Sequence, residues 1–168
     1  TISTYLKRMN IDRRVRGDYN NIVLDFDYFE KIDTSNKAYY LGFIAADGYN
    51  NKSKLLEITL HPKDKQQLEN FVKEIKSNRP ITIKKGKYVY LGIFSKRFMS
   101  HLETHGIVPC KSLVLKYPIT VPKEFQKDFD RGYFDGDGSI SKDGKKIEIV
   151  GTQDILLGIA ESIFQSVK

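Results

Sequence analysis

Two aspartates occupy matching places in a motif that occurs twice in this sequence, and such a pair could bind divalent cations. Asp47 is followed by glycine in the stretch 41–48 (LGFIAADG), and Asp137 is followed by glycine in 131–138 (RGYFDGDG), about 90 residues later. Carboxylate oxygens are ligands of Mg²⁺ and Ca²⁺. Two cations beside a phosphodiester can activate water and stabilise the leaving oxygen. The pair therefore indicates metal-dependent phosphodiester hydrolysis, if the fold brings the carboxylates together.

Small residues in both motifs provide a way to bring the carboxylates together. Gly42 and Ala46 are four residues apart, as are Gly132 and Gly136, so each predicted helix has one nearly flat face. Two flat faces allow two helix backbones to approach closely. The aspartates would then meet at the helix C-termini, where like charges repel and the helix dipoles add negative charge. This destabilising arrangement suggests a functional use, namely the binding of divalent cations. The candidate metal-binding residues are Asp47, Asp137, Ala46 and Gly136.

The same packing sets an expectation for bulk at the helix interface. We expect Gly132 and Gly136 to reject large side chains, with leucine as the decisive substitution. Alanine is expected to be a gentle change, because Ala46 already stands at the place equivalent to Gly136. The alternative explanation is two unrelated helices that each end in Asp-Gly, a common turn pair. The strand and helix that follow both motifs favour a true internal repeat.

Hydrophobic periodicity predicts the elements that would position these motifs. Residues 35–46 are apolar almost throughout, as in a helix buried on more than one side, with Thr34 or Ser35 as its cap and Gly48 suited to its C-terminal turn. A hairpin is centred on Gly86. The remaining elements are predicted as helices at 1–11, 64–75, 95–105, 123–134 and 154–167, and strands at 55–61, 81–85, 87–94 and 147–149.

Composition narrows the class of protein. The chain has 168 residues with 40% hydrophobic and 12% aromatic residues, enough for a packed core. Its single cysteine excludes an internal disulfide, and no apolar run is long enough to span a membrane. No signal peptide is present, so we expect a cytoplasmic (nucleoid-associated) or organellar protein that is not secreted. Because the chain begins without methionine, we expect it to be cut from something longer.

The charge distribution indicates a polyanionic partner. The net charge is +7, and Glu103 is the only acidic residue between positions 75 and 122. A basic stretch of this kind is typical of nucleic-acid binding, although a solvated face is the alternative for either basic cluster alone. The first cluster contains Lys76, Arg79, Lys84, Lys85, Lys87, Lys96, Arg97, Lys111 and Lys116, and the second contains Lys7, Arg8, Arg13, Arg14 and Arg16.

The two motifs and the order of the elements resemble the LAGLIDADG homing endonucleases of the two-motif, monomeric type. The resemblance covers about residues 33–168 and implies an α+β fold. Its αββαββα unit carries a four-stranded antiparallel saddle sheet that lies in the DNA major groove. The first motif departs from the family by carrying Ala45 where Asp135 stands in the second. The implied organisation is an N-terminal helix and basic connector at 1–32, a first unit at 33–108, a linker at 109–122 and a partial second unit at 123–168.

The resemblance also implies roles for particular residues. Asp47 and Asp137 would bind the catalytic Mg²⁺ or another divalent cation, with Lys85, Lys87 and Lys96 as candidates for the assisting lysine. Gly42, Ala46, Gly132 and Gly136 would form the helix interface. The polar sides of the strands would face double-stranded DNA through Glu57, Thr59, His61, Thr82, Lys84, Tyr88 and Tyr90. The connector, as the end of a helix-turn-helix, would add Arg13, Arg14 and Arg16.

Other functions stay open on the same fold. A non-cleaving DNA-binding regulator and an RNA-binding intron-splicing cofactor are the alternatives to a magnesium-dependent endonuclease. An intein is a third alternative, but the sequence shows no splicing-junction residues. A metal-binding or structural module without nucleic-acid function is the alternative that the sequence favours least. The second unit is expected to lack its second hairpin and last helix. We therefore expect a fragment or a degenerate protein, with weak or absent cleavage.

Three further motifs are discounted. Residues 135–146 begin like an EF-hand loop, but Ile140 and Lys146 replace its glycine and glutamate. His101 and His105 are four residues apart on a predicted helix, without a third ligand, so we expect surface histidines. Cys110 has no positioned base in the sequence and is expected to be structural.

The basic stretch from Lys76 to Lys116 predicts electrostatic binding to duplex DNA. Each neutralised phosphate releases counterions, so affinity should fall steeply as salt rises. The measurement is the dissociation constant for a DNA duplex across a salt series. An affinity that stays constant between low and moderate salt would exclude this mode of binding.

Overall fold

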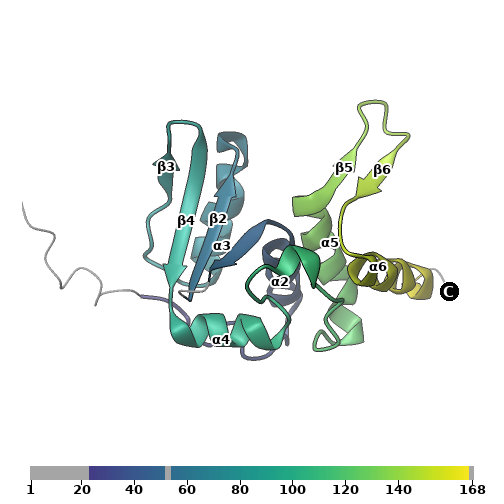
Figure 1. The fold of residues 1–168 in the computed structure, drawn as a ribbon, viewed down its shortest axis with the longest axis horizontal. Helices are drawn as coiled ribbons and strands as arrows, with labels where there is room; N and C mark the ends of the chain where they lie inside the picture. Colours follow the sequence, from purple (N-terminus) through teal and green to yellow (C-terminus); the bar gives the residue numbers. More distant parts are fainter. Residues whose placement is uncertain (1–22, 52–53, 167–168) are drawn as a thin grey trace, which may run out of the picture.

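The chain folds as an α+β protein. The computed structural model describes residues 23–51 and 54–166, in which five α-helices accompany a four-stranded antiparallel sheet and a separate two-stranded sheet (Figure 1). The helices are α2 (Ser35–Asp47), α3 (Lys65–Glu74), α4 (Lys96–Thr104), α5 (Gln126–Asp137) and α6 (Gln153–Ser166). The strands are β1 (Gly48–Asn51), β2 (Leu55–Leu60), β3 (Thr82–Lys84), β4 (Tyr88–Phe94), β5 (Gly138–Ile140) and β6 (Ile147–Ile149). Short 3-10 helices are η2 (Pro62–Asp64), η3 (Lys111–Leu113) and η4 (Lys123–Phe125).

The larger sheet has the order β1-β2-β4-β3, with all neighbours antiparallel. Its register places Gly48, Ile58 and Leu91 in one row across three strands. The predicted alternation along β2 and β4 is confirmed, because one face is buried and the other is partly exposed. The buried face contributes Leu56, Ile58, Leu60, Val89, Leu91 and Ile93 to the core. In Figure 1, α3 lies behind this sheet and α4 crosses its lower end.

Side-chain caps fix the starts of two helices, in agreement with the sequence. The Thr34 hydroxyl oxygen accepts a hydrogen bond from the Lys37 backbone N–H at 3.3 Å, which starts α2. The Ser95 hydroxyl accepts from the Phe98 N–H at 3.2 Å, which starts α4. The apolar sequence of α2 is explained by burial on two sides, because it packs against both the sheet core and α5.

Helices α2 and α5 pack in parallel at backbone contact, and their contacts are reciprocal. A Cβ at Gly42 would collide with the Phe129 carbonyl and lie 2.8 Å from the Tyr133 nitrogen. A Cβ at Gly132 would collide with the Tyr39 carbonyl and lie 3.0 Å from the Phe43 nitrogen. Adding 90 to Tyr39, Gly42 and Phe43 gives Phe129, Gly132 and Tyr133. The internal repeat therefore forms a pseudo-two-fold interface within one chain.

The glycines after the two aspartates end their helices by passing directly into strands. The helix ends at Asp47-Gly48 as predicted, but Gly48 forms no C-terminal turn: it is extended, with φ −77° and ψ 138°, and begins β1 directly. A Cβ at Gly48 would lie 2.6 Å from the Ile44 carbonyl oxygen. Glycine is thus required at position 48 because there is no room for a Cβ atom, and not because the backbone has a positive φ. Gly138 is extended in the same way and begins β5.

The segments predicted as connectors contribute to the core. The predicted linker at 109–122 buries Leu115 and Val121 in the same cluster as the sheet residues. Residues 23–32 pack Phe29 and Ile32 into that cluster as well. The predicted helix at 1–11 and the rest of the basic connector up to residue 22 lie outside the described residues.

The second repeat is less covered than the first. Ile147 of β6 stands at the place equivalent to Leu56 of β2, yet its exposed fraction is 66% where that of Leu56 is 1%. In the first repeat, β4 pairs with β2 and α4 contacts it. Among the described residues, the second repeat has, after α5, only the β5–β6 pair and α6. None of the described helices combines the length and the apolar character needed to cross a bilayer.

The interface geometry revises the expectation for alanine. Gly42→Ala and Gly132→Ala should each lower the free energy of unfolding by about 1–3 kcal/mol, because the new methyl group meets a backbone carbonyl that cannot move aside. Gly136→Ala should also destabilise, but less, because its Cβ would lie 2.4 Å from the Ala46 Cβ atom and not against a backbone carbonyl. Chemical denaturation measures all three. Unfolding midpoints for Gly42→Ala and Gly132→Ala equal to that of the parent would contradict the backbone contact.

Candidate metal and nucleic-acid site

The parallel packing of α2 and α5 brings their C-terminal aspartates together. A Cβ built on Gly136 would lie 3.1 Å from the Asp47 Oδ2 atom, so the two helix ends are in contact. Burial, followed by the nearby Asp137 carboxylate, raises the pKa of Asp47 from 3.8 to about 6, against the lowering effect of the Lys111 charge. A buried carboxyl beside a second one holds its proton more tightly because two adjacent negative charges repel.

Lys111 is the residue at this site that sequence analysis left without a role. The sequence marks it only as one of the nine basic residues in the first cluster. No hydrophobic periodicity around Lys111 predicts that its side chain is buried. The structure buries it, with its Nζ donating hydrogen bonds to the carbonyl oxygens of Ala45 at 2.5 Å and Ala46 at 2.9 Å. Burial lowers the pKa of Lys111, while the Asp137 and Asp47 carboxylates oppose that shift. The ammonium therefore offsets both carboxylates and the negative C-terminal end of α2.

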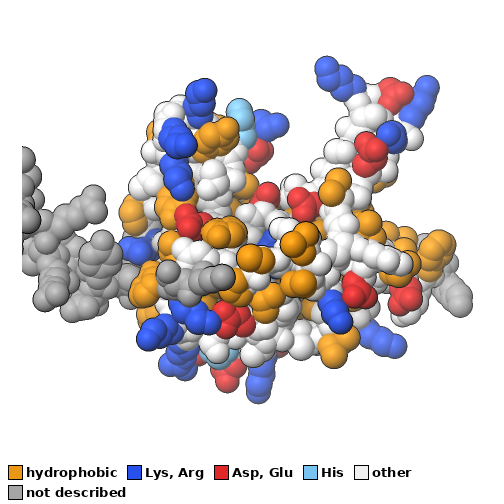
Figure 2. Space-filling model, in the orientation of Figure 1, with side chains coloured by type: hydrophobic (Ala, Val, Ile, Leu, Met, Phe, Trp, Pro, Cys, Tyr) orange, Lys and Arg blue, Asp and Glu red, His pale blue; other side chains and the backbone are white. Residues whose placement is uncertain are grey.

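A polar cleft of about 510 Å³ opens beside Asp47. Its walls come from the ends of α2 and α5, the end of β2 and the start of α3. Figure 2 shows the hollow between two projections, with acidic side chains at its floor and Lys and Arg side chains on both projections. The lining residues are Phe43, Asp47, Thr59, Leu60, His61, Lys63, Asp64, Gln66, Gln67, Asp135 and Gly136.

The donor set at the helix ends fits a magnesium ion shared with a substrate. No group of three or more His, Cys, Asp or Glu side chains that could hold a metal occurs in the part of the chain that the structure describes. Mg²⁺ is commonly held by one or two carboxylates, with water and substrate phosphates completing its shell. Asp47 and Asp137 supply that number. The Ala46 carbonyl already accepts from Lys111, whereas Gly136 lines the cleft.

The open face of the four-stranded sheet carries most of the proposed DNA-facing residues. Thr59, Tyr90 and Thr82 stand in one cross-strand row, and Tyr88 pairs with Lys84 in the next row. Because directly paired residues share a face, these side chains lie on one surface. His61 departs from this face, since it caps η2 and lines the cleft with Asp47.

A polar network already orders this open face. The Lys84 Nζ lies 4.5 Å from the centre of the Tyr90 ring and 3.7 Å from a Glu57 oxygen. Burial and a hydrogen bond to Glu57 raise the pKa of Tyr90, so its hydroxyl remains a donor. The aromatic and cationic side chains are thus held in fixed positions while their edges stay accessible. Such a surface suits stacking and phosphate contacts.

The lysines predicted to assist catalysis lie in the β3–β4 turn and in α4. Lys85 and Lys87 are exposed in the β3–β4 turn, and Lys96 is exposed in the first turn of α4. Lys111 is the lysine whose charge acts on the pKa of Asp47. Arg13, Arg14 and Arg16 lie outside the described residues.

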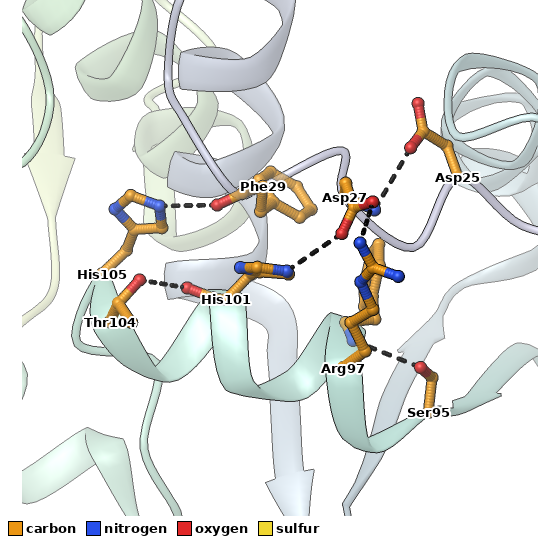
Figure 3. A network of polar contacts seen from close by, with 9 residues as sticks. Asp25, Asp27, Phe29, Ser95, Arg97, His101, Thr104 and His105 are labelled. Carbon is orange, nitrogen blue, oxygen red and sulfur yellow. Dashed lines mark hydrogen bonds and ion pairs between the residues drawn. The ribbon is translucent and has the colours of Figure 1, made fainter.

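The histidines of α4 are not the surface residues that the sequence predicted. Figure 3 shows His101 facing Asp27 and His105 facing the Phe29 carbonyl. His105 is buried, with 2.8 Å from Nε2 to the Phe29 oxygen and 2.7 Å from Nδ1 to the Thr120 hydroxyl. Burial lowers the pKa of His105, so the neutral ring donates to Phe29 and accepts from Thr120. These histidines tie the N-terminal segment to α4 and serve packing. Cys110 is exposed and turns the chain before Lys111, with φ +61°.

Comparison with known proteins assigns no relationship. No protein-family model matches this chain, and a search of curated proteins returned no match. The candidate site therefore depends on its own geometry: two crowded carboxylates, one buried lysine and a polar cleft beside an accessible sheet face.

The raised pKa of Asp47 predicts a pH-dependent loss of stability. The folded state binds the Asp47 proton more tightly than the unfolded state, so this contribution is present below pH 4 and disappears as pH rises through about 6. Asp47→Asn should remove the loss and leave the variant roughly 1–3 kcal/mol more stable than the parent at pH 7. Denaturant unfolding between pH 4 and 7 measures the difference.

A matched control for that experiment is Asp154→Asn, which makes the same charge change at an exposed position of α6. It should leave the parent's pH dependence in place. The interpretation fails if the parent and Asp47→Asn lose stability in parallel over this pH range.

Proposed function

We propose that this chain is a magnesium-dependent DNA endonuclease, or the DNA-binding part of one, built on the LAGLIDADG arrangement. The observation that carries the proposal is the reciprocal contact of α2 and α5, which brings Asp47 and Asp137 close enough for their charges to act on one another and on the buried Lys111. Carboxylate repulsion of this kind destabilises a fold, and a divalent cation relieves it. An internal repeat that preserves the repulsion at both positions favours a catalytic use over a helix-ending one.

The residues of the proposed site would have different roles in catalysis. Bound Mg²⁺ would supply the charge that activates water and stabilises the leaving oxygen of a phosphodiester. Asp47 and Asp137 would hold it at the junction of the two repeats. Lys111, held by hydrogen bonds to two carbonyl oxygens, places a positive charge near both carboxylates and limits the repulsion between them. The buried interface keeps these groups in place without rearrangement.

The surroundings of the site suit a duplex. The accessible sheet face carries Lys84, Tyr88 and Tyr90 next to the cleft that contains Asp47. Exposed lysines rise on both sides of the cleft, at the β3–β4 turn and at the β5–β6 turn (Figure 2). A polyanion lying across the cleft would meet positive charge at both ends and the carboxylates at the centre. The family resemblance adds the expectation that the sheet enters the major groove.

A plasmid-nicking assay tests the proposal. With Mg²⁺, the chain should convert supercoiled plasmid to the nicked form only slowly, as expected for a partial second unit, and EDTA should prevent this. Asp137→Asn should reduce nicking by at least about 100-fold while DNA affinity stays constant or rises, because one charge that repels phosphate has gone.

Asp154→Asn is again the control, since it changes net charge equally without touching the site. Metal-independent nicking, or equal nicking by Asp137→Asn and the parent, would refute the proposal. Salt-sensitive DNA binding without any nicking would indicate that the chain is a DNA-binding protein and not an enzyme.

A further inference from the structure

Strand β6 has one edge that no other strand covers in the part of the chain that the structure describes. Within that part, the smaller sheet consists of β5 and β6, with Ile140 paired to Ile147 and Gly138 paired to Ile149. A two-stranded sheet is marginally stable by itself in water, and further strands stabilise it. In the first repeat the equivalent strand β2 has such a neighbour, because β4 pairs with its second edge. The free edge of β6 is therefore a place that suits an antiparallel strand.

The hydrogen bonds to β5 show which backbone groups of β6 point to the free edge. The Ser141 N–H donates to the Lys146 carbonyl oxygen at 2.9 Å, and the Val150 N–H donates to the Asp137 carbonyl oxygen at 3.1 Å. Residues 146 and 150 thus direct their backbone groups toward β5. Backbone groups of successive residues point to alternate sides of a strand, so the N–H and C=O of Ile147 point to the free edge.

The side chains beside this edge are apolar and exposed. Ile147 has 66% of its surface exposed, and its partner Ile140 on β5 has 59%. Because directly paired residues share a face, both isoleucines lie on one surface. Helix α6 lies at the base of this hairpin (Figure 1) and exposes Leu157 and Phe164. Exposed apolar side chains beside an unpaired strand edge are typical of a surface that binds another protein chain.

Charge complementarity favours a second copy of this chain as the partner. Lys146 and Glu148 flank Ile147, and within one copy they form an exposed ion pair at 2.7 Å. Two β6 strands can pair antiparallel about a two-fold axis at Ile147, so that the Ile147 N–H of each copy meets the Ile147 C=O of the other. This register places Lys146 of each copy opposite Glu148 of the other, and opposite charges across a strand pair stabilise it.

The other free strand edge near lysines lacks this complementarity. Strand β3 stands at one end of the larger sheet and exposes Ile83, with Lys84 beside it. Its three residues include no acidic side chain, so two copies paired there would have no opposite charge to set against the lysine. The charges therefore distinguish β6 from β3 as the edge for self-association.

We propose that the free edge of β6 is a self-association surface, at which two copies of this chain join their smaller sheets into one four-stranded antiparallel sheet. The strand order across the axis is β5-β6-β6-β5. The arrangement is closed, because each copy uses the same edge. One short strand and a few apolar side chains make a small interface, so we expect a dissociation constant in the micromolar range. The inference goes beyond the proposed nuclease function, since it requires neither metal nor DNA.

Sedimentation velocity of the whole chain over a series of micromolar concentrations, without metal or DNA, tests the surface. The parent should pass from monomer to dimer as concentration rises. Ile147→Lys should stay monomeric, because it places a charge in the apolar contact. Ile83→Lys is the matched control, since it makes the same change at an exposed isoleucine of the edge strand β3. It should associate like the parent, and melting temperatures show that each variant is folded.

A charge exchange tests the register of the two strands. Glu148→Lys should weaken the dimer by about tenfold, because lysines then oppose each other on both sides of the axis. The double variant Lys146→Glu with Glu148→Lys sets opposite charges against each other again. Its dimer should therefore be as stable as that of the parent.

The results of these variants separate the β6 edge from other modes of association. A parent dimer that Ile147→Lys and Glu148→Lys weaken, that Ile83→Lys preserves and that the double charge exchange restores supports the inference. A parent that stays monomeric overturns it, as does a dimer that Ile147→Lys leaves intact. Equal loss in Ile83→Lys and Ile147→Lys, or no recovery in the double variant, also overturns it. Species that grow beyond a dimer would contradict the closed two-fold arrangement.

Discussion

The approach of two helix backbones at Gly42 and Gly132 is the constraint on which the rest of the structure depends. Each glycine faces a carbonyl of the opposite helix without room for a Cβ atom, and the contacts repeat at an offset of 90 residues. This approach joins the two repeats into one core, because α2 packs on the sheet and α5 carries the second repeat. It also fixes the distance between the helix ends, since two rigid helices in close contact have little freedom to slide.

The same contact creates an electrostatic problem that neighbouring groups reduce. Two aspartates meet where two helices end, so the carboxylates face each other and the negative ends of both dipoles. The raised pKa of Asp47 reflects burial and this repulsion. Lys111 reaches the place from outside both repeats, through a segment that packs on the core, and bonds to the last carbonyls of α2. A buried ammonium is itself unfavourable unless paired, so the lysine and the carboxylates stabilise one another.

Symmetry at the interface is limited to its backbone contacts. Side chains break it: Tyr39 donates to Asp135 at 2.6 Å, whereas the equivalent pair is Phe129 and Ala45. Tyr133 likewise stands where the other half has Phe43. The backbone contact leaves no room for a Cβ atom at Gly42 or Gly132, while the side chains around it differ between the two halves. A repeated fold can in this way carry two chemically distinct half-sites.

Sequence alone determined the five described helices, the strands β2, β3, β4 and β6, the two faces of β2 and β4, the cap at Ser95 and the equivalence of Asp47 with Asp137. It missed the short strands β1 and β5 and left the cap of α2 open between Thr34 and Ser35. The features that it determined follow from local hydrophobic periodicity, from hydrogen bonding within a few residues and from the similarity of the two repeats. All three can be recognised in the amino-acid sequence. Tertiary structure alone decided that Lys111 turns inward, that His105 is buried, and that Gly48 is required by lack of space. Each depends on atoms distant in sequence, such as the Phe29 carbonyl for His105 and the carboxylate of Asp137 for Lys111. A basic or polar residue looks the same in sequence whether it faces solvent or a buried partner, because only the folded chain supplies that partner.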